Sequence, residues 1–181
     1  MTGPASLSSE RLSFRVVEKK DAPALFEAWT SDPVTVRYLQ WRPHQTLPEA
    51  EEFFERLERA TASQEKSYYV VSDLSGVDVG FASLKVEEGC RAILGFIVFS
   101  AYRGRGYASE IIRKLCDWSL SEPGIFRVYA LCDVENKASI RAMVKAGFSQ
   151  EGILRRWAVH PNVGSEPRDV ISLAKTKTPN Q

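Results

Sequence analysis

The most constraining feature of this sequence is a short loop, rich in glycine and arginine, between a strand and a helix. An apolar run over residues 96–99 precedes the loop, which reads Arg103-Gly-Arg-Gly106. Apolar residues then recur at helical spacing from Tyr107 to Trp118, so a helix begins directly after the second glycine. A helix N-terminus presents unpaired N–H groups and a positive dipole end, and glycines let the backbone approach a ligand closely. The loop predicts a pyrophosphate site; the alternative is an ordinary turn with two surface arginines.

Two common phosphate-binding motifs do not fit this loop. The dinucleotide fingerprint G-x-G-x-x-G needs a third glycine where this chain has Ser109, and the preceding strands read as hairpins rather than an opening βαβ unit. The Gly-Lys-Ser/Thr of a P-loop is also missing from it.

Hydrophobic periodicity predicts an α+β fold, with a mixed sheet. Short spacers at Ser75–Gly76 and Glu87–Gly89 join three strands as antiparallel hairpins, whereas the helix after the loop connects two parallel strands. The expected strands are residues 12–17, 67–72, 77–86, 92–99, 126–132, 148–158 and 170–175.

Four helices are expected around this sheet. Asp21 can cap the first and Thr46 the second, and the third covers residues 107–121. Asn136 can cap the fourth, which ends at Gly147.

Composition favours a single domain over residues 11–177, after a small, polar and flexible segment at residues 1–10. The 181 residues are 44% hydrophobic, and the net charge of +1 gives no reason to expect a nucleic-acid or membrane partner. No apolar run is long enough for a membrane helix. The three cysteines lack a C-x-x-C pairing, which favours buried thiols in a reducing cytoplasm.

Two spaced motifs resemble the signatures of GNAT-superfamily acetyltransferases. The first is the R-G-x-G-x-A segment from Arg103 to Ala108, and the second is Asn136-x-x-Ser139 followed by a helix that ends in Gly147-Phe148. Within the superfamily, the arrangement is similar to the Rim-type branch, which acetylates protein N-termini and includes small-molecule acetyltransferases. The resemblance implies a GNAT fold, mostly antiparallel, with a splayed parallel pair of strands and about four helices.

The resemblance also implies acetyl-CoA as co-substrate and no metal. Backbone groups of Ile97 and Val98 would bind the pantetheine arm, and the Val98 amide would stabilise the oxyanion. Asn136 would bind the arm from the other strand, and Ser139 would assist the leaving thiolate; alternatively, Ser139 is a helix-surface serine. The implied binding residues are Ile97, Val98, Arg103, Gly104, Arg105, Gly106, Tyr107, Ala108, Ser109, Asn136 and Ser139.

Two other side chains near these motifs are interpreted as structural. Tyr107 fits a helix-face core aromatic whose backbone still lines the phosphate site. Cys132 lacks a basic partner nearby in sequence, and the family uses direct attack by the amine, so an acyl-cysteine is disfavoured.

The general base is not evident from the family pattern. A Rim-type glutamate seven residues after Glu151 would fall on Ala158, which cannot accept a proton. His160 lies two residues further, on the same side of a strand, and is the candidate base; alternatively, it is a turn residue before Pro161. Three carboxylates could act through water: Asp133, Glu135 and Glu151.

The acceptor pocket is expected around the polar loop at residues 155–169. Trp157 and His160 would line it, Arg155, Arg156 and Arg168 could meet a carboxylate, and Tyr38 and Trp41 could form the other wall. The alternative is a plain surface loop. An α-amine is roughly 10–20% neutral at pH 7 and a lysine below about 0.1%, so without a strong base an α-amine or low-pKa primary amine is favoured.

The predicted function is acetyl transfer from acetyl-CoA to a primary amine, on a peptide N-terminus or a small molecule, by a monomer or homodimer. The alternative is a non-catalytic acyl-CoA-binding module, which the missing glutamate at Ala158 would suit. An RNA-binding role for Arg-Gly-Arg-Gly-Tyr is disfavoured, because the chain is near neutral and lacks a stacking signature.

Overall fold

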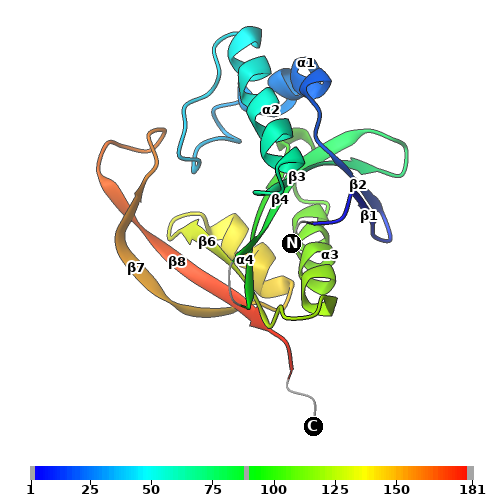
Figure 1. The fold of residues 1–181 in the computed structure, drawn as a ribbon. Coiled ribbons are helices and arrows are strands. Elements are labelled where there is room, and N and C mark those ends of the chain that lie inside the picture. The colour runs from blue at the N-terminus through cyan, green and yellow to red at the C-terminus, as the bar shows by residue number, and fades with distance from the viewer. Residues whose placement is uncertain (1–2, 88–89, 179–181) are drawn as a thin grey trace.

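Eight strands form one sheet among residues 3–87 and 90–178, the part of the chain that the computed structural model describes (Figure 1). The strand order is β1-β2-β3-β4-β5-β6-β8-β7. All neighbouring strands are antiparallel except the parallel pair β5–β6, as the sequence predicted. The strands are β1 (Ser6–Ser8), β2 (Leu12–Val16), β3 (Ser67–Asp73), β4 (Asp78–Glu87), β5 (Arg91–Val98), β6 (Arg127–Asp133), β7 (Ser149–Val159) and β8 (Pro167–Thr176).

Four α-helices cover the two faces of this sheet: α1 (Ala22–Leu25), α2 (Leu47–Ala62), α3 (Tyr107–Ser121) and α4 (Lys137–Lys145). Successive residues of a strand point to opposite faces. Accordingly, Val70 is buried in the core under α1 and α2, whereas its neighbour Val71 is buried in the core that α3 and α4 close. Burial on both faces explains why the central strands are more continuously apolar than a half-exposed sheet would be.

The parallel pair separates soon after it begins, which opens a wedge in the sheet. Strands β5 and β6 are in register only from Arg91 and Arg127 to Ile93 and Tyr129. Beyond these residues β5 stays paired with β4, and β6 stays paired with β8. The edges of β5 and β6 that face each other therefore have no strand partner over the remaining length, as expected of the splayed pair of a GNAT fold. On the β5 edge, the Val98 carbonyl accepts a hydrogen bond from Arg103 Nε at 3.4 Å.

The structure revises the expectation for the N-terminal residues. Residues 1–10 were expected to precede the domain as a flexible segment, but Ser6–Ser8 pair with β2 as strand β1. The Gly3 N–H also donates to Ser67 Oγ, and the Tyr69 hydroxyl donates to the Pro4 carbonyl. Three residues were too few for alternation to reveal the strand. Residues 1–2 lie outside the described residues, as do residues 88–89 of the expected turn at Glu87–Gly89.

The helix boundaries match the prediction more closely than the capping contacts do. Asp21 stands at the N-cap of α1, but its carboxylate accepts the N–H of Glu18 at 2.9 Å, and a π-helical turn over Phe26–Thr30 continues α1. Thr46 stands at the N-cap of α2, but no side-chain capping bond is made there.

Among the described residues, no helix is long and apolar enough to span a membrane.

Candidate active site

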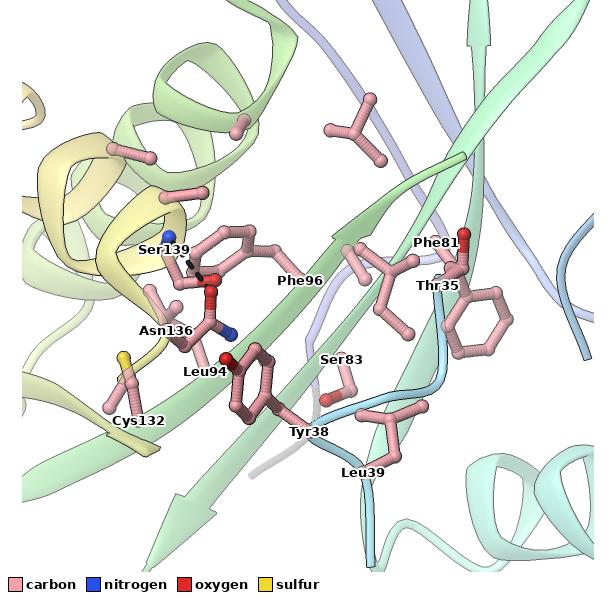
Figure 2. A pocket seen from close by; sticks show the side chains of 18 of the residues that line it. Thr35, Tyr38, Leu39, Phe81, Ser83, Leu94, Phe96, Cys132, Asn136 and Ser139 are labelled. Atoms are coloured by element: carbon pink, nitrogen blue, oxygen red, sulfur yellow. Dashed lines mark hydrogen bonds between the residues drawn. The ribbon is translucent and has the colours of Figure 1, made fainter. Parts of the chain in front are cut away.

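A continuous cavity of about 1210 Å³ runs from the N-terminus of α3 through the wedge and across the α2 face of the sheet. Its walls come from helices α2, α3 and α4, from strands β3 to β8 and from residues 34–41. Figure 2 shows the wedge, with Asn136 and Ser139 on one side and Phe96 and Leu94 on β5. Thr35 and Leu39 lie across the opening, and Tyr38 reaches over it to donate from its hydroxyl to the Glu135 carbonyl at 3.4 Å. Nearly all the predicted site residues line this cavity; Arg105 and Arg155 do not, nor do Arg156 and Arg168.

The loop before α3 has the backbone conformation that the sequence predicted for an anion site. Gly104 and Gly106 have φ of +80° and +83°, a left-handed region that side chains with a Cβ rarely adopt. From Gly104 to Ser109 the backbone N–H groups have no acceptor among the described residues. A Cβ on Gly104 would meet nothing within 4 Å, so a ligand can reach the backbone there. These donors fit the pyrophosphate of CoA.

The two loop arginines take different positions. Arg103 lines the cavity and donates from Nη2 to Thr35 Oγ1 at 3.1 Å. Arg105 lies outside the cavity lining and instead places its guanidinium over the Tyr102 ring. The Arg105 Cζ atom lies 5.2 Å from the centre of that ring, and Arg105 Nη2 donates to the Ala101 carbonyl at 3.4 Å, so the guanidinium contacts residues that precede the loop.

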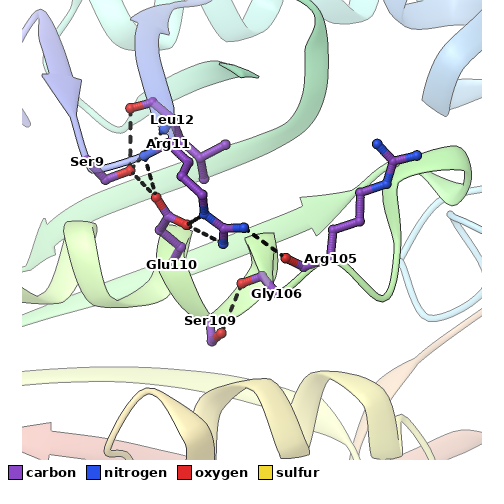
Figure 3. Close-up of polar contacts among 7 residues, drawn as sticks. All are labelled: Ser9, Arg11, Leu12, Arg105, Gly106, Ser109 and Glu110. Atoms are coloured by element: carbon purple, nitrogen blue, oxygen red, sulfur yellow. Dashed lines mark hydrogen bonds and ion pairs between the residues drawn. The ribbon is translucent and has the colours of Figure 1, made fainter. Parts of the chain in front are cut away.

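A network from the connection between β1 and β2 holds the loop in place (Figure 3). Glu110, in the first turn of α3, accepts hydrogen bonds from Ser9 Oγ at 2.8 Å and from the Arg11 backbone N–H at 2.9 Å. The Arg11 guanidinium pairs with the same carboxylate and donates to the Arg105 carbonyl at 3.2 Å. Ser109 closes the turn by donating to the Gly106 carbonyl at 3.0 Å. Sequence reasoning missed this support because its residues are about 100 positions apart.

The hydrogen-bond ladder of β5 decides which of its backbone groups face the wedge. Phe99 donates to the Val79 carbonyl at 3.0 Å, and opposite pairs in an antiparallel ladder alternate between bonded and non-bonded. Ile97 therefore belongs to a bonded pair with Phe81, and its carbonyl lies 2.5 Å from the position of a Cβ built on Gly80. The backbone of Val98 points into the wedge as predicted, whereas that of Ile97 points to β4. Phe96, which the sequence reasoning missed, is the second group facing the wedge.

Asn136 and Ser139 meet across the first turn of α4. The Asn136 side-chain oxygen accepts the Ser139 backbone N–H at 3.3 Å, which confirms the predicted N-cap. This contact leaves the Asn136 amide nitrogen and the Ser139 hydroxyl without protein partners among the described residues. Both side chains line the cavity and lie beside each other in Figure 2, so they remain available to a ligand in the wedge.

The sequence reasoning also missed two cations on α4. Arg141 and Lys145 are one helical turn apart and line the cavity opposite the loop before α3. The i, i+4 spacing of Arg141 and Lys145 in the helix that Asn136 caps was a sequence signal that could have revealed them.

Tyr107 packs against the core that α3 closes and also lines the cavity, in agreement with its interpretation as a core aromatic beside the predicted phosphate site.

His160 follows β7 directly and is buried against Asp133 at the end of β6. The His160 Nδ1 atom lies 2.8 Å from Asp133 Oδ2, and the His160 residue is 4% exposed. Arg168 donates to both Asp133 oxygens, and the Glu135 N–H donates to Oδ1 at 2.8 Å. Burial opposes ionisation of Asp133, but these hydrogen bonds outweigh it and hold its pKa at about 2.

This geometry sets the tautomer of the imidazole. A carboxylate with a pKa of about 2 accepts hydrogen bonds only, so Nδ1 carries the proton that Asp133 accepts. The neutral ring then has its lone pair on Nε2, which has no protein partner among the described residues. His160 and Ala158 both line the cavity, as expected for positions two apart on a strand.

The other proposed bases and the thiol are less suited to proton transfer. Glu151 is paired with Arg127 and lies outside the cavity lining, and the Glu135 side chain is outside it as well. Cys132 lines the wedge, but burial raises the pKa of its thiol to about 11. The thiol is thus protonated near neutral pH, in agreement with its interpretation as a structural residue.

The acceptor side of the cavity is closed by residues 32–41, the roof loop. Asn162 fastens this loop to the β7–β8 connection, since its Nδ2 donates to the Val36 carbonyl at 2.8 Å and to the Trp41 carbonyl at 2.7 Å. The Tyr38 ring meets the His160 ring edge to face at 6.4 Å. Tyr38 and Trp41 line the cavity as predicted, and Asn162 was not anticipated.

The arginines expected to meet an acceptor carboxylate are already paired. Residues 155–157 bulge from β7 opposite a single residue of β8, Asp169, which binds Arg155 through its carboxylate and accepts the Arg156 N–H. The Arg156 side chain pairs with Glu166, and Arg168 is bound to Asp133 as described above. The bulge leaves Trp157 58% exposed at the cavity wall, whereas Arg155 points away from it.

Comparison with known proteins agrees with this geometry. The acetyltransferase (GNAT) domain family matches residues 11–149. The chain belongs to the GNAT acetyltransferase family, which confirms the family and the enzyme class inferred from the two motifs.

Among the described residues, no group of three or more His, Cys, Asp or Glu side chains could hold a metal ion.

Two curated relatives align over nearly the whole chain. The uncharacterized N-acetyltransferase YoaA of Bacillus subtilis (strain 168) is 29% identical over 178 residues, which cover 94% of this chain and 97% of YoaA. The spermidine N(1)-acetyltransferase of Escherichia coli (strain K12) is 23% identical over 181 residues, covering 96% and 95% of the two chains.

Solved structures show the same fold. A GNAT-family acetyltransferase from Bacillus anthracis has a TM-score of 0.81 at 25% identity, covering 94% of this chain and 98% of that one. The ribosomal L7/L12 α-N-protein acetyltransferase RimL, solved in complex with coenzyme A, has a TM-score of 0.81 at 19% identity, covering 96% of each chain. The fold of Rim-type enzymes is thus shared by this chain.

Proposed function

We propose that this protein transfers an acetyl group from acetyl-CoA to a primary amine, on a peptide N-terminus or a small molecule, by direct attack. The carrying observation is the buried His160–Asp133 pair on the wall of the cavity that begins at the loop before α3. A cavity that only stored CoA would need the phosphate loop and the wedge, but not an oriented imidazole at the other end. We place the reaction in the cytoplasm, where the free cysteines stay reduced.

Acetyl-CoA binding is assigned to three parts of the cavity. The N–H groups of Gly104 to Ser109 would take the pyrophosphate, supported by the positive end of α3. The unpaired β5 edge at Phe96 and Val98 would bind the pantetheine arm as a neighbouring strand would, with Asn136 opposite. The Val98 N–H would be the donor, since the Val98 carbonyl already accepts from Arg103 Nε. Arg141 and Lys145 would neutralise the remaining phosphate charge.

The chemistry then follows from groups already oriented by the fold. The amine nitrogen forms a bond to the thioester carbonyl carbon, and the Val98 N–H stabilises the oxygen that becomes negative. His160 Nε2 accepts the proton that the amine loses, while Asp133 stabilises the resulting imidazolium through Nδ1. The carbon–sulfur bond breaks, and the Ser139 hydroxyl donates a proton to the leaving thiolate. Ser139 and His160 then recover their starting states by exchange with water.

Acetyl-CoA-dependent thiol release with an amine panel tests this proposal. We expect CoA release with at least one primary amine, and His160→Gln should reduce kcat about 10²- to 10⁴-fold without weakening acetyl-CoA binding. The rising limb of the kcat/KM pH profile should also disappear in that variant. Asp133→Asn should also lower kcat, because it removes the charge that stabilises the imidazolium.

His44→Gln serves as the matched control, since His44 is the chain's other histidine and stacks on Trp41 outside the cavity lining. It should retain the wild-type pH profile. Binding of CoA without thiol release by any amine would contradict the proposal and favour an acyl-CoA-binding module, which the apolar Ala158 at the family's glutamate position would suit.

A further inference from the structure

We propose, building on the function proposed above, that the acceptor amine carries an anionic group, a carboxylate or a phosphate, which pairs with Lys66 at the α2 end of the cavity. Lys66 lies between α2 and β3 and lines the same cavity as His160 and the loop before α3. The reactive amine would lie at His160 and the anion at Lys66, with the body of the acceptor across the sheet between them.

The charges that line the cavity are strongly unequal. Its only lining carboxylate among the described residues is Asp133, which is already bonded to Arg168 and His160. None of the lining cations is ion-paired with a described carboxylate. These cations are Arg37, Lys66, Arg103, Arg141 and Lys145. An acceptor with only positive charge would be repelled, whereas an anionic group would be attracted.

Arg37 belongs to the roof loop, where its Cζ atom lies 5.6 Å from the centre of the Tyr38 ring, and the other four cations divide into two groups by their place in the fold. Arg103, Arg141 and Lys145 surround the proposed phosphate end, where CoA supplies negative charge. Lys66 lies at the opposite end, beyond the wedge, between α2, which contributes Leu57 to the lining, and β3, which contributes Tyr68. The phosphates of CoA bound at α3 therefore leave the Lys66 charge without a counter-ion.

Lys66 is held where an anion would gain most from pairing with it. Its ammonium lies 5.1 Å from the centre of the Tyr68 ring, and the side chain is half-buried. Burial, and then the charge of Lys85, lower the pKa of Lys66. The adjacent Glu65 forms no ion pair with it. A partly desolvated ammonium gains more from an anion than an exposed one, because water screens the pair less.

Strand register gives the separation between the amine and the anion. Ser67 is level with Leu84 and hence with Leu94, so Lys66 is level with Ile93. Tyr129 is in register with Ile93, and Asp133 lies four residues further along β6. Four residues of strand correspond to roughly 13 Å along the strands, and the three strand spacings from β3 to β6 add roughly 14 Å across the sheet. The diagonal is therefore roughly 19 Å, which an extended peptide spans in about six residues. In a peptide acceptor the anion would lie near the fifth to seventh residue.

The surface between these two ends suits an uncharged segment. Leu39, Tyr68 and Phe81 line it, and the floor at Gly95 carries no side chain. Ser83 Oγ lies 2.8 Å from the position of a Cβ built on Gly95, so the Ser83 hydroxyl covers this part of the floor (Figure 2). A polyamine would need carboxylates along this path, and the described residues offer none. The proposed acceptor therefore differs in charge from spermidine, the polyamine in the name of the Escherichia coli relative.

The test compares C-terminally amidated hexapeptides that differ only at the sixth residue. The probes are Ser-Ala-Ala-Ala-Ala-Glu, the same peptide ending in Gln or in Lys, and a phosphoserine version, with spermidine as the polyamine. We expect kcat/KM to be highest for the glutamate or phosphoserine peptide, and their ratio will distinguish a carboxylate from a phosphate site. Lys66→Met should remove that advantage, a loss of about tenfold, whereas Lys66→Arg should keep most of it.

Lys19→Met is the control, because it removes the same charge from a lysine that lies outside the cavity lining, paired with Glu55, and should leave the acid preference in place. Equal or better turnover of the lysine peptide or spermidine by the wild type would overturn the inference, as would an acid preference that survives Lys66→Met. In each of these cases CoA is released, so the proposed function stands. Absence of CoA release with every probe and with a wider amine panel would instead contradict the proposed function.

Discussion

Replacing Gly104 with alanine separates the anion site from simple backbone strain. Gly104 and Gly76 have nearly the same left-handed φ, +80° and +84°, and a Cβ at either would meet nothing within 4 Å. An alanine held there costs about 1–2 kcal/mol, which lowers Tm by roughly 2–8 °C in a domain of this size. Gly104→Ala and Gly76→Ala should therefore lose similar stability in scanning calorimetry.

Of Gly104 and Gly76, only Gly104 lies where the proposed pyrophosphate approaches the backbone. A methyl group in that space would separate the phosphate from at least one N–H, and a hydrogen bond to a charged group contributes about 1.5–3 kcal/mol. We therefore expect the Kd for CoA, measured by isothermal titration calorimetry, to rise about 10- to 100-fold in Gly104→Ala. Gly76→Ala should bind CoA like the wild type, and Gly104→Asp should bind it still more weakly than Gly104→Ala.

Equal CoA affinity in Gly104→Ala and Gly76→Ala, with both variants destabilised, would refute the pyrophosphate assignment. If Gly104→Ala lost no stability, the left-handed conformation at this position would be wrong. The two measurements thus test the backbone conformation and the ligand separately.

Three further predictions follow from groups around the cavity. Alkylation at pH 8 should modify the exposed Cys90 but spare Cys132, whose thiol has a pKa of about 11, and mass spectrometry of the labelled native protein checks this. Asn162→Asp removes the two donors that hold the roof loop, so the acceptor KM should rise about five- to tenfold while the KM for acetyl-CoA stays constant; equal rises in both would contradict it. Because the folded pKa of Asp133 is depressed from 3.8 to about 2, its ionisation contributes about 2 kcal/mol above pH 4, which is lost as the pH falls towards 2. Urea unfolding should therefore show Asp133→Asn to be less stable than the wild type at pH 6, by a margin that shrinks at pH 3.

Much of the candidate site was predictable because its signals are local. The loop from Arg103 to Gly106 and the N-cap at Asn136 each involve residues within a few positions of one another, and both have the conformation that the sequence predicted. Hydrophobic periodicity also predicted seven of the strands to within a few residues, since alternation records which face is buried. Strand β1 was missed because three residues carry too little periodicity.

The contacts between distant segments could not be predicted in the same way. Whether Ile97 or Val98 faces the wedge depends on the hydrogen-bond phase between β4 and β5, which periodicity does not record. The bulge in β7 similarly decided that Arg155 binds Asp169 rather than an acceptor.

The sequence by itself determined that this chain has a glycine loop, two motifs and the strand and helix pattern of a GNAT acetyltransferase. Only the tertiary structure decided that His160 meets Asp133, that the predicted arginines are already paired, and that Lys66 remains without a described partner in the cavity. The physical reason is that backbone conformation follows from neighbouring residues, whereas a pair of side chains 27 residues apart meets only through the register and splay of whole strands.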